Sequence, residues 1–392
     1  MSKQLQFIQE CTQSDLKGKV VLLRLDLNMP IADGVVANEY RIDASMPTIN
    51  FLRESGAKVI IIAHIESKQT DTLRIVFPVI KKRFENARFC DDIFSDTTKE
   101  VVAKMQEADV VLFENLRKWE GEKVNDVEFV KQIADYADLY VNDAFSVCHR
   151  EHASVVGIPQ YIPGYAGLNI QKEAKALSKT FNPEYPFLFI IGGAKFETKL
   201  PLLRKFVDVA DTVYVGGALA NDIYKARGLE VGTSLVSEID VKEIADKENV
   251  RVPEMVIVKR GTEAVTVSVG NKGSDDFDNS ENFDNSVQVS DAIYDADPQS
   301  IVSLGEIITA AKTIVWNGPL GDYEHGFTLG TQALALAVAD SGAYSIVGGG
   351  DTLASIQDMN LTDRINFIST GGGAMLDFLA NETLPGIEVL KR

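Results

Sequence analysis

Short apolar runs alternate with amphipathic segments along the whole chain. In its first half these runs occupy residues 20–23, 59–62, 110–113 and 139–141. Continuous apolar runs of this length are typical of strands buried on both faces of a parallel sheet. Between the runs, apolar residues recur at helical spacing, as they do at Met46, Ile49, Leu52 and at Phe129, Ile133, Tyr136. The alternation predicts an α/β fold with a doubly wound sheet.

The same pattern starts again in the second half of the chain. Apolar runs there occupy residues 187–191, 212–215, 255–258, 313–316 and 345–347. At 392 residues the chain is also too long for one ordinary core, since single cores stop growing at roughly 250–300 residues. The pattern predicts two doubly wound parallel-sheet (Rossmann-like) domains with a ligand cleft between them. A Lys-, Glu- and Ala-rich helix over residues 168–181 joins them, and the boundary lies near residues 164–167.

The charge balance narrows the possible partners. The formal net charge is −18, from 57 acidic and 39 basic side chains. Such a surface repels nucleic acid and anionic membranes, and an anionic substrate needs a local cluster of cations and backbone N–H groups. The chain contains no apolar run of membrane-spanning length, and the N-terminal residues lack a secretory signal. The three cysteines (Cys11, Cys90, Cys148) are widely spaced, which favours reduced thiols and a cytoplasmic location.

Residues 270–300 form the most acidic segment of the chain. One basic residue, Lys272, accompanies eight acidic residues: Asp275, Asp276, Asp278, Glu281, Asp284, Asp291, Asp295 and Asp297. A calcium-binding EF-hand is excluded because the obligatory loop glycine is missing. The segment is predicted to be a solvated excursion on the surface.

Polar residues follow the predicted strands of the first half at the carboxyl ends, where α/β sheets bind ligands. They are Asp26, Asn28, Arg41, His64, Arg117 and Arg150. Any one of them could be a structural ion pair, but together they suit a phosphate and a carboxylate, which guanidinium groups bind bidentately. His149 and His152 could form a metal pair, although no third ligand lies nearby in the sequence.

Glycine-rich turns follow the predicted strands of the second half. They lie at residues 192–199, 348–352 and 369–373, and each opens a helix whose first N–H groups can bind an anion. Lys195 and Lys199 are expected on one face of the first of these helices, and Asp351 could hold a magnesium ion. Glycine pairs alone are a weak signal, because many of them only form tight turns. The chain has neither a P-loop nor the protein-kinase motif set. The pattern predicts a small phosphorylated acid on one domain and a magnesium–nucleotide on the other.

At these residues the chain closely resembles the phosphoglycerate kinase family. The matching stretches are residues 24–30, 41–49, 114–117, 140–157, 192–199, 313–321, 346–352 and 369–378. The resemblance implies reversible phosphoryl transfer between 1,3-bisphosphoglycerate and ADP, giving 3-phosphoglycerate and ATP in glycolysis. It also implies a monomer whose lobes close about a hinge. The implied domains are 1–165 for 3-phosphoglycerate, 166–370 for the nucleotide, and 371–392 as a C-terminal helix and tail that returns to the first domain.

The resemblance implies a role for each candidate residue. Asp26, Asn28, Arg41, His64, Arg117 and Arg150 would bind the acid substrate. The nucleotide, with Mg²⁺ at Asp351, would contact Lys195, Lys199, Asn317, Glu324, Gly349, Gly350, Asp351 and Thr352. The acceptor carboxylate is already ionised at pH 7, so no general base is needed. Charge on the transferring group would be cancelled by Arg41, Lys199 and the N–H groups around Gly372.

The chain departs from the family after the second predicted strand. The family pattern His-Leu-Gly-Arg-Pro is replaced by His64-Ile65-Glu66-Ser67-Lys68, and the loop that follows, up to residue 77, is shortened. Ser67 stands where the family has an arginine that would contact the acid substrate. Losing that charge-assisted contact costs roughly 1.5–3 kcal/mol, so the acid substrate is expected to bind more weakly. Asp297 also replaces a family glycine, and the sequence differs just after Glu324. Two alternatives stay open: a nucleotide-binding relative that has lost substrate affinity, and a metal-dependent hydrolase built on His149 and His152.

Overall fold

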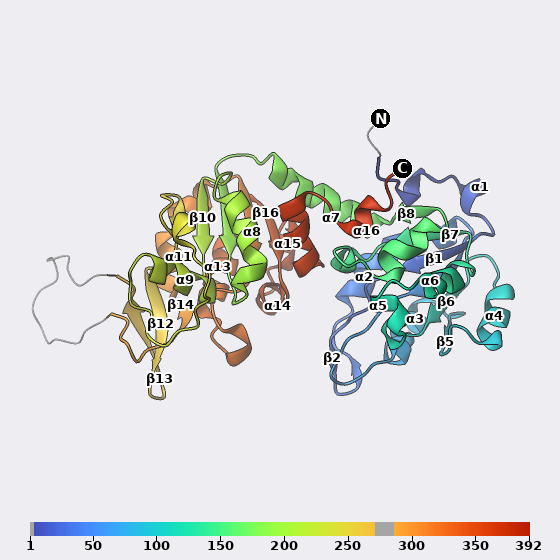
Figure 1. Cartoon of the computed structure of the whole chain (residues 1–392), viewed down its shortest axis with the longest axis horizontal. Coiled ribbons are helices and arrows are strands. Elements are labelled where there is room, and N and C mark those ends of the chain that lie inside the picture. Colours follow the sequence, from blue (N-terminus) through green and yellow to red (C-terminus); the bar gives the residue numbers. More distant parts are fainter. Residues whose placement is uncertain (1–3, 271–285) are drawn as a thin grey trace, which may run out of the picture. The chain divides into compact units, whose positions relative to one another are not determined.

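The chain forms two compact units in the computed structural model, which describes residues 4–270 and 286–392 (Figure 1). Unit 1 comprises Met1–Lys175 and Asn381–Arg392, and unit 2 comprises Ala176–Ala380. The divisions expected from the sequence were after residues 165 and 370. In the structure the first falls inside helix α7 (Leu168–Ser178) and the second at the end of α15 (Gly372–Asn381).

Unit 1 is built around a six-stranded sheet of order β5-β6-β4-β1-β7-β8, in which every neighbouring pair is parallel. The strands are β1 (Val20–Arg24), β4 (Lys58–Ile62), β5 (Arg88–Cys90), β6 (Val110–Phe113), β7 (Leu139–Asn142) and β8 (Gly164–Ala166). The four strands predicted from apolar runs are thus confirmed as β1, β4, β6 and β7. Their carboxyl ends share one edge of the sheet, and the candidate acid-binding residues follow them in the chain.

Helices and short turns connect these strands. The helices of unit 1 are α1 (Gln13–Leu16), α2 (Tyr40–Glu54), α3 (Phe77–Arg83), α4 (Asp96–Ala103), α5 (Glu120–Lys123), α6 (Val127–Ala134) and α16 (Pro385–Glu388). A two-stranded hairpin, β2 (Ile31–Ala32) with β3 (Val35–Val36), precedes α2. Tyr136 was predicted on the helical face of α6 but lies beyond its end, where its hydroxyl donates to the Ile93 carbonyl at 2.5 Å.

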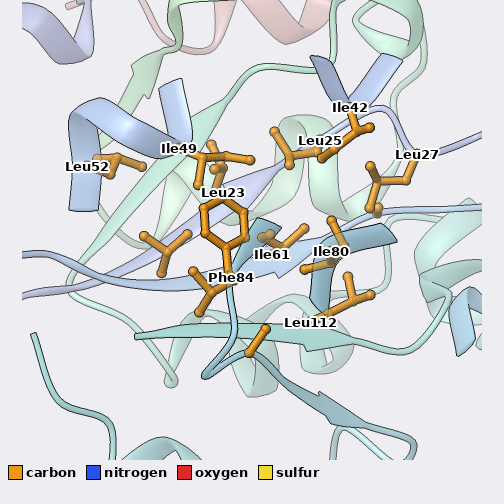
Figure 2. Packing of buried hydrophobic residues seen from close by; sticks show 14 of the residues in the cluster. Leu23, Leu25, Leu27, Ile42, Ile49, Leu52, Ile61, Ile80, Phe84 and Leu112 are labelled. Atoms are coloured by element: carbon orange, nitrogen blue, oxygen red, sulfur yellow. The ribbon is translucent and has the colours of Figure 1, made fainter. Parts of the chain in front are cut away.

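The core of unit 1 fixes the helix that carries Arg41. Ile42, Ile49 and Leu52 lie along one face of α2 and are fully buried. Figure 2 shows them with side chains of the neighbouring strands in a cluster around Phe84. Burying an aliphatic side chain contributes ~1.5–3 kcal/mol, so this face holds the first turn of α2 at the sheet edge.

The C-terminal segment belongs to unit 1. Leu5 and Lys391 form an antiparallel bridge, and the N–H of Gln4 donates to the Arg392 carbonyl at 2.9 Å. Gly386 of α16 packs on Cys148, so closely that an added Cβ would lie 3.0 Å from the Cys148 Cα.

Unit 2 repeats the architecture with its own six-stranded sheet, of order β11-β10-β9-β15-β16-β17 and again parallel throughout. The strands are β9 (Phe187–Ile191), β10 (Thr212–Val215), β11 (Val250–Arg251), β15 (Thr313–Asn317), β16 (Tyr344–Gly348) and β17 (Phe367–Ile368). Its helices, besides α15, are α8 (Phe196–Phe206), α9 (Ala218–Ala226), α10 (Lys242–Ala245), α11 (Pro298–Ser303), α12 (Gly305–Ala310), α13 (Leu329–Asp340) and α14 (Gly350–Asp358). Two doubly wound parallel-sheet units confirm the predicted fold class.

One predicted strand belongs to a different sheet. The apolar run at residues 255–258 was placed with the second parallel set, but β12 (Met255–Arg260) lies in an antiparallel sheet. It pairs there with β13 (Glu263–Ser268) and β14 (Ile293–Ala296). A short buried run carries no information about the direction of its neighbours, which explains the error.

The prediction of a solvated acidic segment is wrong for its last part. Asp291 and Asp295 are 1% exposed and Asp297 is 9% exposed. Asp291 forms an ion pair with Arg260 of β12, at 2.8 Å, and Asp297 caps α11 by accepting from the Gln299 N–H at 2.8 Å. The remaining acidic residues (Asp275, Asp276, Asp278, Glu281, Asp284) lie outside the described residues.

Helix α7 begins in unit 1 and ends in unit 2. Its first turn is capped by Asp143, which follows β7 and accepts from the N–H groups of Asn169 at 2.7 Å and Ile170 at 3.3 Å. Gly167 permits this contact, because an added Cβ would lie 2.3 Å from the Asp143 carboxylate. Burial raises the pKa of Asp143 to about 7.

No helix in the described part of the chain is both long and apolar enough to cross a membrane. The three cysteines are free thiols, and two of them, Cys90 and Cys148, are buried.

Candidate functional site

Asp26 organises the sheet edge of unit 1 immediately after β1. Its carboxylate is 4% exposed and forms an ion pair with Arg41 of α2. It also accepts from the Ser146 hydroxyl at 2.6 Å and from the Asn28 N–H at 3.1 Å. Asp26 therefore fixes the Arg41 guanidinium, which keeps further N–H donors for a ligand.

His64 is held as a neutral hydrogen-bond donor. It is 3% exposed, and its Nδ1 lies 3.1 Å from Nη2 of Arg24. A guanidinium has no acceptor, so Nδ1 accepts and the ring proton sits on Nε2. Burial, together with Arg24, Arg117 and Arg41, lowers the pKa of His64 well below its usual value. The imidazole therefore offers Nε2–H to a ligand throughout the physiological pH range.

A buried network of Arg24, Ser154 and Glu122 holds the hydrogen-bond partner of His64 in place. Arg24 is fully buried and its Nε donates to the Ser154 hydroxyl at 2.8 Å. That hydroxyl donates at 2.6 Å to Glu122, which is also fully buried and accepts from the Ser154 N–H at 2.9 Å. Sequence reasoning passed over Arg24 and Glu122. The signal for Arg24 was an arginine that directly ends an apolar strand run.

Arg117 and Asn28 are both engaged by one loop residue, Glu66. Arg117 is 13% exposed and its Nη1 forms an ion pair with the Glu66 carboxylate, whose side chain is 63% exposed. The backbone N–H of Glu66 donates to the Asn28 Oδ1 at 2.8 Å. The amide nitrogen of Asn28 is therefore the part of that side chain left to meet a ligand, and it can only donate.

The residues after β6 hold this loop in place. Asn115 donates to the carbonyls of Ile65 and Asp71 at 2.9 and 2.7 Å. Glu114 accepts from the Leu73 N–H at 2.8 Å and from the Thr72 hydroxyl at 2.5 Å. Glu66 is thus held at the sheet edge by fixed backbone at both ends of the loop.

Arg150 completes the cationic cluster. It is exposed, and its charge acts on Arg117 and on His152. Burial and the charges of Arg117, Arg24 and Arg150 lower the pKa of His152 to about 4. The same positive field opposes a bound cation. Across residues 4–270 and 286–392 no group of three His, Cys, Asp or Glu side chains could hold a metal ion, so nothing favours the alternative of a metal pair at His149 and His152.

In unit 2 the candidate site is built mainly from backbone. Gly192 and Gly193 follow β9 and lie against the turn after β15: the N–H of Gly192 donates to the Asn317 carbonyl at 2.9 Å and that of Gly193 to the Pro319 carbonyl at 2.8 Å. An added Cβ on Gly192 would lie 2.1 Å from the Pro319 oxygen. These turns exist only because the side chains are absent.

Lys199 reaches back from the first turn of α8 to this glycine turn. It is 9% exposed, and its Nζ donates to the Gly192 carbonyl. Burial lowers its pKa to about 8, with Asp351 opposing the shift and Lys195 adding to it. The expected shared face is not observed, because Lys195 precedes α8 as its N-cap residue and is exposed, whereas Lys199 is buried.

Asp351 lies in the first turn of α14, beside the same lysine. Burial and then the charge of Glu324 raise its pKa, while Lys199 lowers it. Glu324 is exposed on the turn after β15. A carboxylate whose charge is disfavoured by burial and by a nearby carboxylate fits a magnesium ion, which is commonly bound by one or two carboxylates plus substrate phosphates.

The starts of α14 and α15 meet at glycines. An added Cβ on Gly372 would lie 3.3 Å from the Gly349 Cα, and Gly349 has a φ of 107° that favours glycine. Thr352 is buried and its hydroxyl accepts from the Gly318 N–H at 3.2 Å. Asn317 is 3% exposed, and its Nδ2 lies 4.0 Å from the Met375 sulfur. Two helix N-termini therefore converge close to Asn317, which suits a polyphosphate.

Comparisons with known proteins agree with this picture. The phosphoglycerate kinase family model matches residues 11–382. A relative named phosphoglycerate kinase, from Dictyoglomus turgidum, is 39% identical over 98% of each chain. The solved phosphoglycerate kinase of Coxiella burnetii matches with a TM-score of 0.81 at 33% identity, covering 99% of both chains. That of Pyrococcus horikoshii matches with a TM-score of 0.84 at 31% identity, covering 98% of both.

Proposed function

The chain belongs to the phosphoglycerate kinase family, and from that premise we propose how its residues divide the work of the reaction. The enzyme transfers a phosphoryl group reversibly between 1,3-bisphosphoglycerate and ADP, giving 3-phosphoglycerate and ATP in glycolysis. The observation that carries the assignment is the match over residues 11–382. The cationic sheet edge of unit 1 and the glycine turns of unit 2 give it a chemical basis.

Unit 1 is proposed to bind the acid substrate. Arg41, Arg117 and Arg150 supply guanidinium groups for its phosphate and carboxylate, and neutral His64 supplies an N–H donor. Asn28 donates through its amide nitrogen, while Asp26 holds Arg41 in place and orients it. This assignment is supported by the pKa of His64, which is lowered by burial and then by the nearby charges of Arg24, Arg117 and Arg41.

Unit 2 is proposed to bind the nucleotide at its glycine turns. Gly349, Gly350 and Thr352 present backbone at the start of α14, with Asn317 and Glu324 on the neighbouring turn and Lys195 at the start of α8. Magnesium, when bound with the nucleotide at Asp351, supplies positive charge that offsets the phosphate oxygens.

Catalysis is proposed to rest on positioning and charge cancellation. The attacking group of 3-phosphoglycerate is a carboxylate that is ionised at neutral pH, so no residue acts as a general base. Arg41, Lys199 and the N–H groups around Gly372 donate to the oxygens of the phosphoryl group in transfer. Since the two substrates bind different units, transfer requires the units to close and exclude water, with α7 as part of the hinge. The enzyme is further proposed to act as a cytoplasmic monomer.

The function is tested by ADP formation from ATP with and without 3-phosphoglycerate. The proposal expects turnover that depends on 3-phosphoglycerate and saturates. Binding of ATP with no stimulation by high millimolar 3-phosphoglycerate would instead identify a nucleotide-binding relative that has lost the reaction. Nothing in the comparisons favours that alternative.

A further inference from the structure

Glu66 occupies two of the groups assigned to the acid substrate. Its carboxylate forms an ion pair with Arg117, and its backbone N–H donates to Asn28 at 2.8 Å. The backbone contact orients Asn28 as a donor and so assists anion binding. The carboxylate contact has the opposite effect, because it places a negative charge on the guanidinium that an anionic ligand needs.

The ion pair is held at the sheet edge by the protein and not by chance contact of two flexible side chains. Arg117 is 13% exposed and emerges from the turn capped by Asn115, whose Oδ1 accepts from the Arg117 N–H at 3.1 Å. Asn115 and Glu114 also hold the loop that carries Glu66. The Glu66 side chain itself is 63% exposed, so a ligand can push it into solvent without opening the core.

We propose that the Glu66 carboxylate is an internal competitor for Arg117, which lowers the affinity for the acid substrate and selects for ligands with more than one negative charge. The inference rests on the proposed function of unit 1 as the acid-binding unit. A ligand must replace one carboxylate on Arg117, so a group that brings no more charge than Glu66 gains little. A phosphorylated acid brings a phosphate and a carboxylate and displaces Glu66 readily.

The competition also sets a salt dependence. An exposed ion pair weakens as salt screens it, with a Debye length of ~10 Å at 0.1 M and ~3 Å at 1 M. The contribution of Glu66 is therefore largest at low ionic strength. Exposed pairs of this kind contribute ~0.2–1 kcal/mol, which corresponds to an affinity change of up to about fivefold.

The test is calorimetric titration of 3-phosphoglycerate into the full chain and three variants at low and high salt. Glu66→Gln removes the charge and keeps the backbone contact with Asn28. Glu100→Gln is the matched control, since Glu100 of α4 forms an exposed ion pair at 3.0 Å with Lys104, which directly follows that helix. Arg117→Lys reports whether Arg117 meets the substrate at all.

The proposal expects Glu66→Gln to bind 3-phosphoglycerate about two- to fivefold more tightly at low salt, with the difference vanishing near 1 M. Glu100→Gln should match the parent protein, and Arg117→Lys should bind more weakly. Unchanged or weaker binding by Glu66→Gln, with Arg117→Lys still impaired, overturns the role of Glu66 and leaves the function intact. If Arg117→Lys also binds normally, the acid site itself is misassigned.

Discussion

The two units share a fold but build their sites from different materials. Both contain a six-stranded all-parallel sheet, and the ligand groups that we propose follow the carboxyl ends of the strands. In unit 1 the proposed groups are side chains, and two of the arginines already form ion pairs: Arg41 with Asp26 and Arg117 with Glu66. In unit 2 they are mostly backbone at glycine turns, with Lys199 as the one buried cation among the predicted site residues.

The difference has a physical consequence. In a site made of paired side chains, the charges are already oriented and neutralised before a ligand binds. A substitution there changes ligand affinity because one interaction partner replaces another. A site built from backbone has no side-chain partner that a ligand could replace. Its shape depends on glycines at positions where there is no room for a Cβ atom. We therefore expect substitutions in unit 2 to have larger effects than those in unit 1.

The largest effect is expected for Lys199→Ala. The substitution removes the buried cation that we propose donates to the oxygens of the transferring phosphoryl group. Loss of one such donor lowers kcat by ~10²–10³-fold. ATP binding should weaken only moderately. Lys247→Ala is the control, because Lys247 forms an exposed pair with Asp208 in the same unit. A kcat within threefold of the parent enzyme would remove Lys199 from the transition-state role.

A single methyl group tests the backbone site. Gly192→Ala would place a Cβ 2.1 Å from the Pro319 carbonyl oxygen, and strain of this kind costs ~1–3 kcal/mol. Nucleotide affinity should fall by about five- to a hundredfold, whereas 3-phosphoglycerate affinity is unaffected. Gly305→Ala is the matched control, since nothing lies within 4 Å of the Cβ it would add. Equal nucleotide binding by both variants would contradict a site shaped by missing side chains.

Ser67→Arg adds a side chain to the paired site and tests whether that site lacks a cation. A new charge-assisted contact can lower the KM for 3-phosphoglycerate by up to about tenfold, and the KM for ATP should not change. The Ser67 hydroxyl accepts from the N–H of Gln69, two residues away, at 3.1 Å, so the substitution removes a local contact. An unaltered KM for 3-phosphoglycerate would show that this loop does not reach the substrate.

The pH dependence of the free enzyme offers the smallest effect. The pKa of Lys199 is lowered to about 8 by burial, so the lysine loses its positive charge progressively as the pH rises through that value. The kcat/KM for ATP should therefore decline as pH rises through about 8, since the neutral amine cannot offset phosphate charge. Lys199→Arg stays cationic and should lack this decline, whatever its absolute activity. The same alkaline limb in both enzymes would assign it to another group.

Much of the fold was predictable because buried strands are recognisable in the sequence as apolar runs, as at residues 187–191. Strands of two or three residues, such as β5, β11 and β17, were too short to give a pattern. The direction of β12 depends on its neighbours in space and not on its own residues. The site candidates were found from their place after strands. The pairing of Glu66 with Arg117 could not be predicted, because the two residues are 51 positions apart in the sequence.

Hydrogen exchange with each ligand added alone tests the division of labour most directly. We predict that 3-phosphoglycerate slows exchange at residues 24–28, 64–73 and 114–118, all in unit 1. Magnesium–ADP should slow exchange at residues 192–199, 349–353 and 371–376, all in unit 2. Protection of the glycine turns by 3-phosphoglycerate alone, with the segments of unit 1 unaffected, would show that unit 1 is not the acid-binding unit.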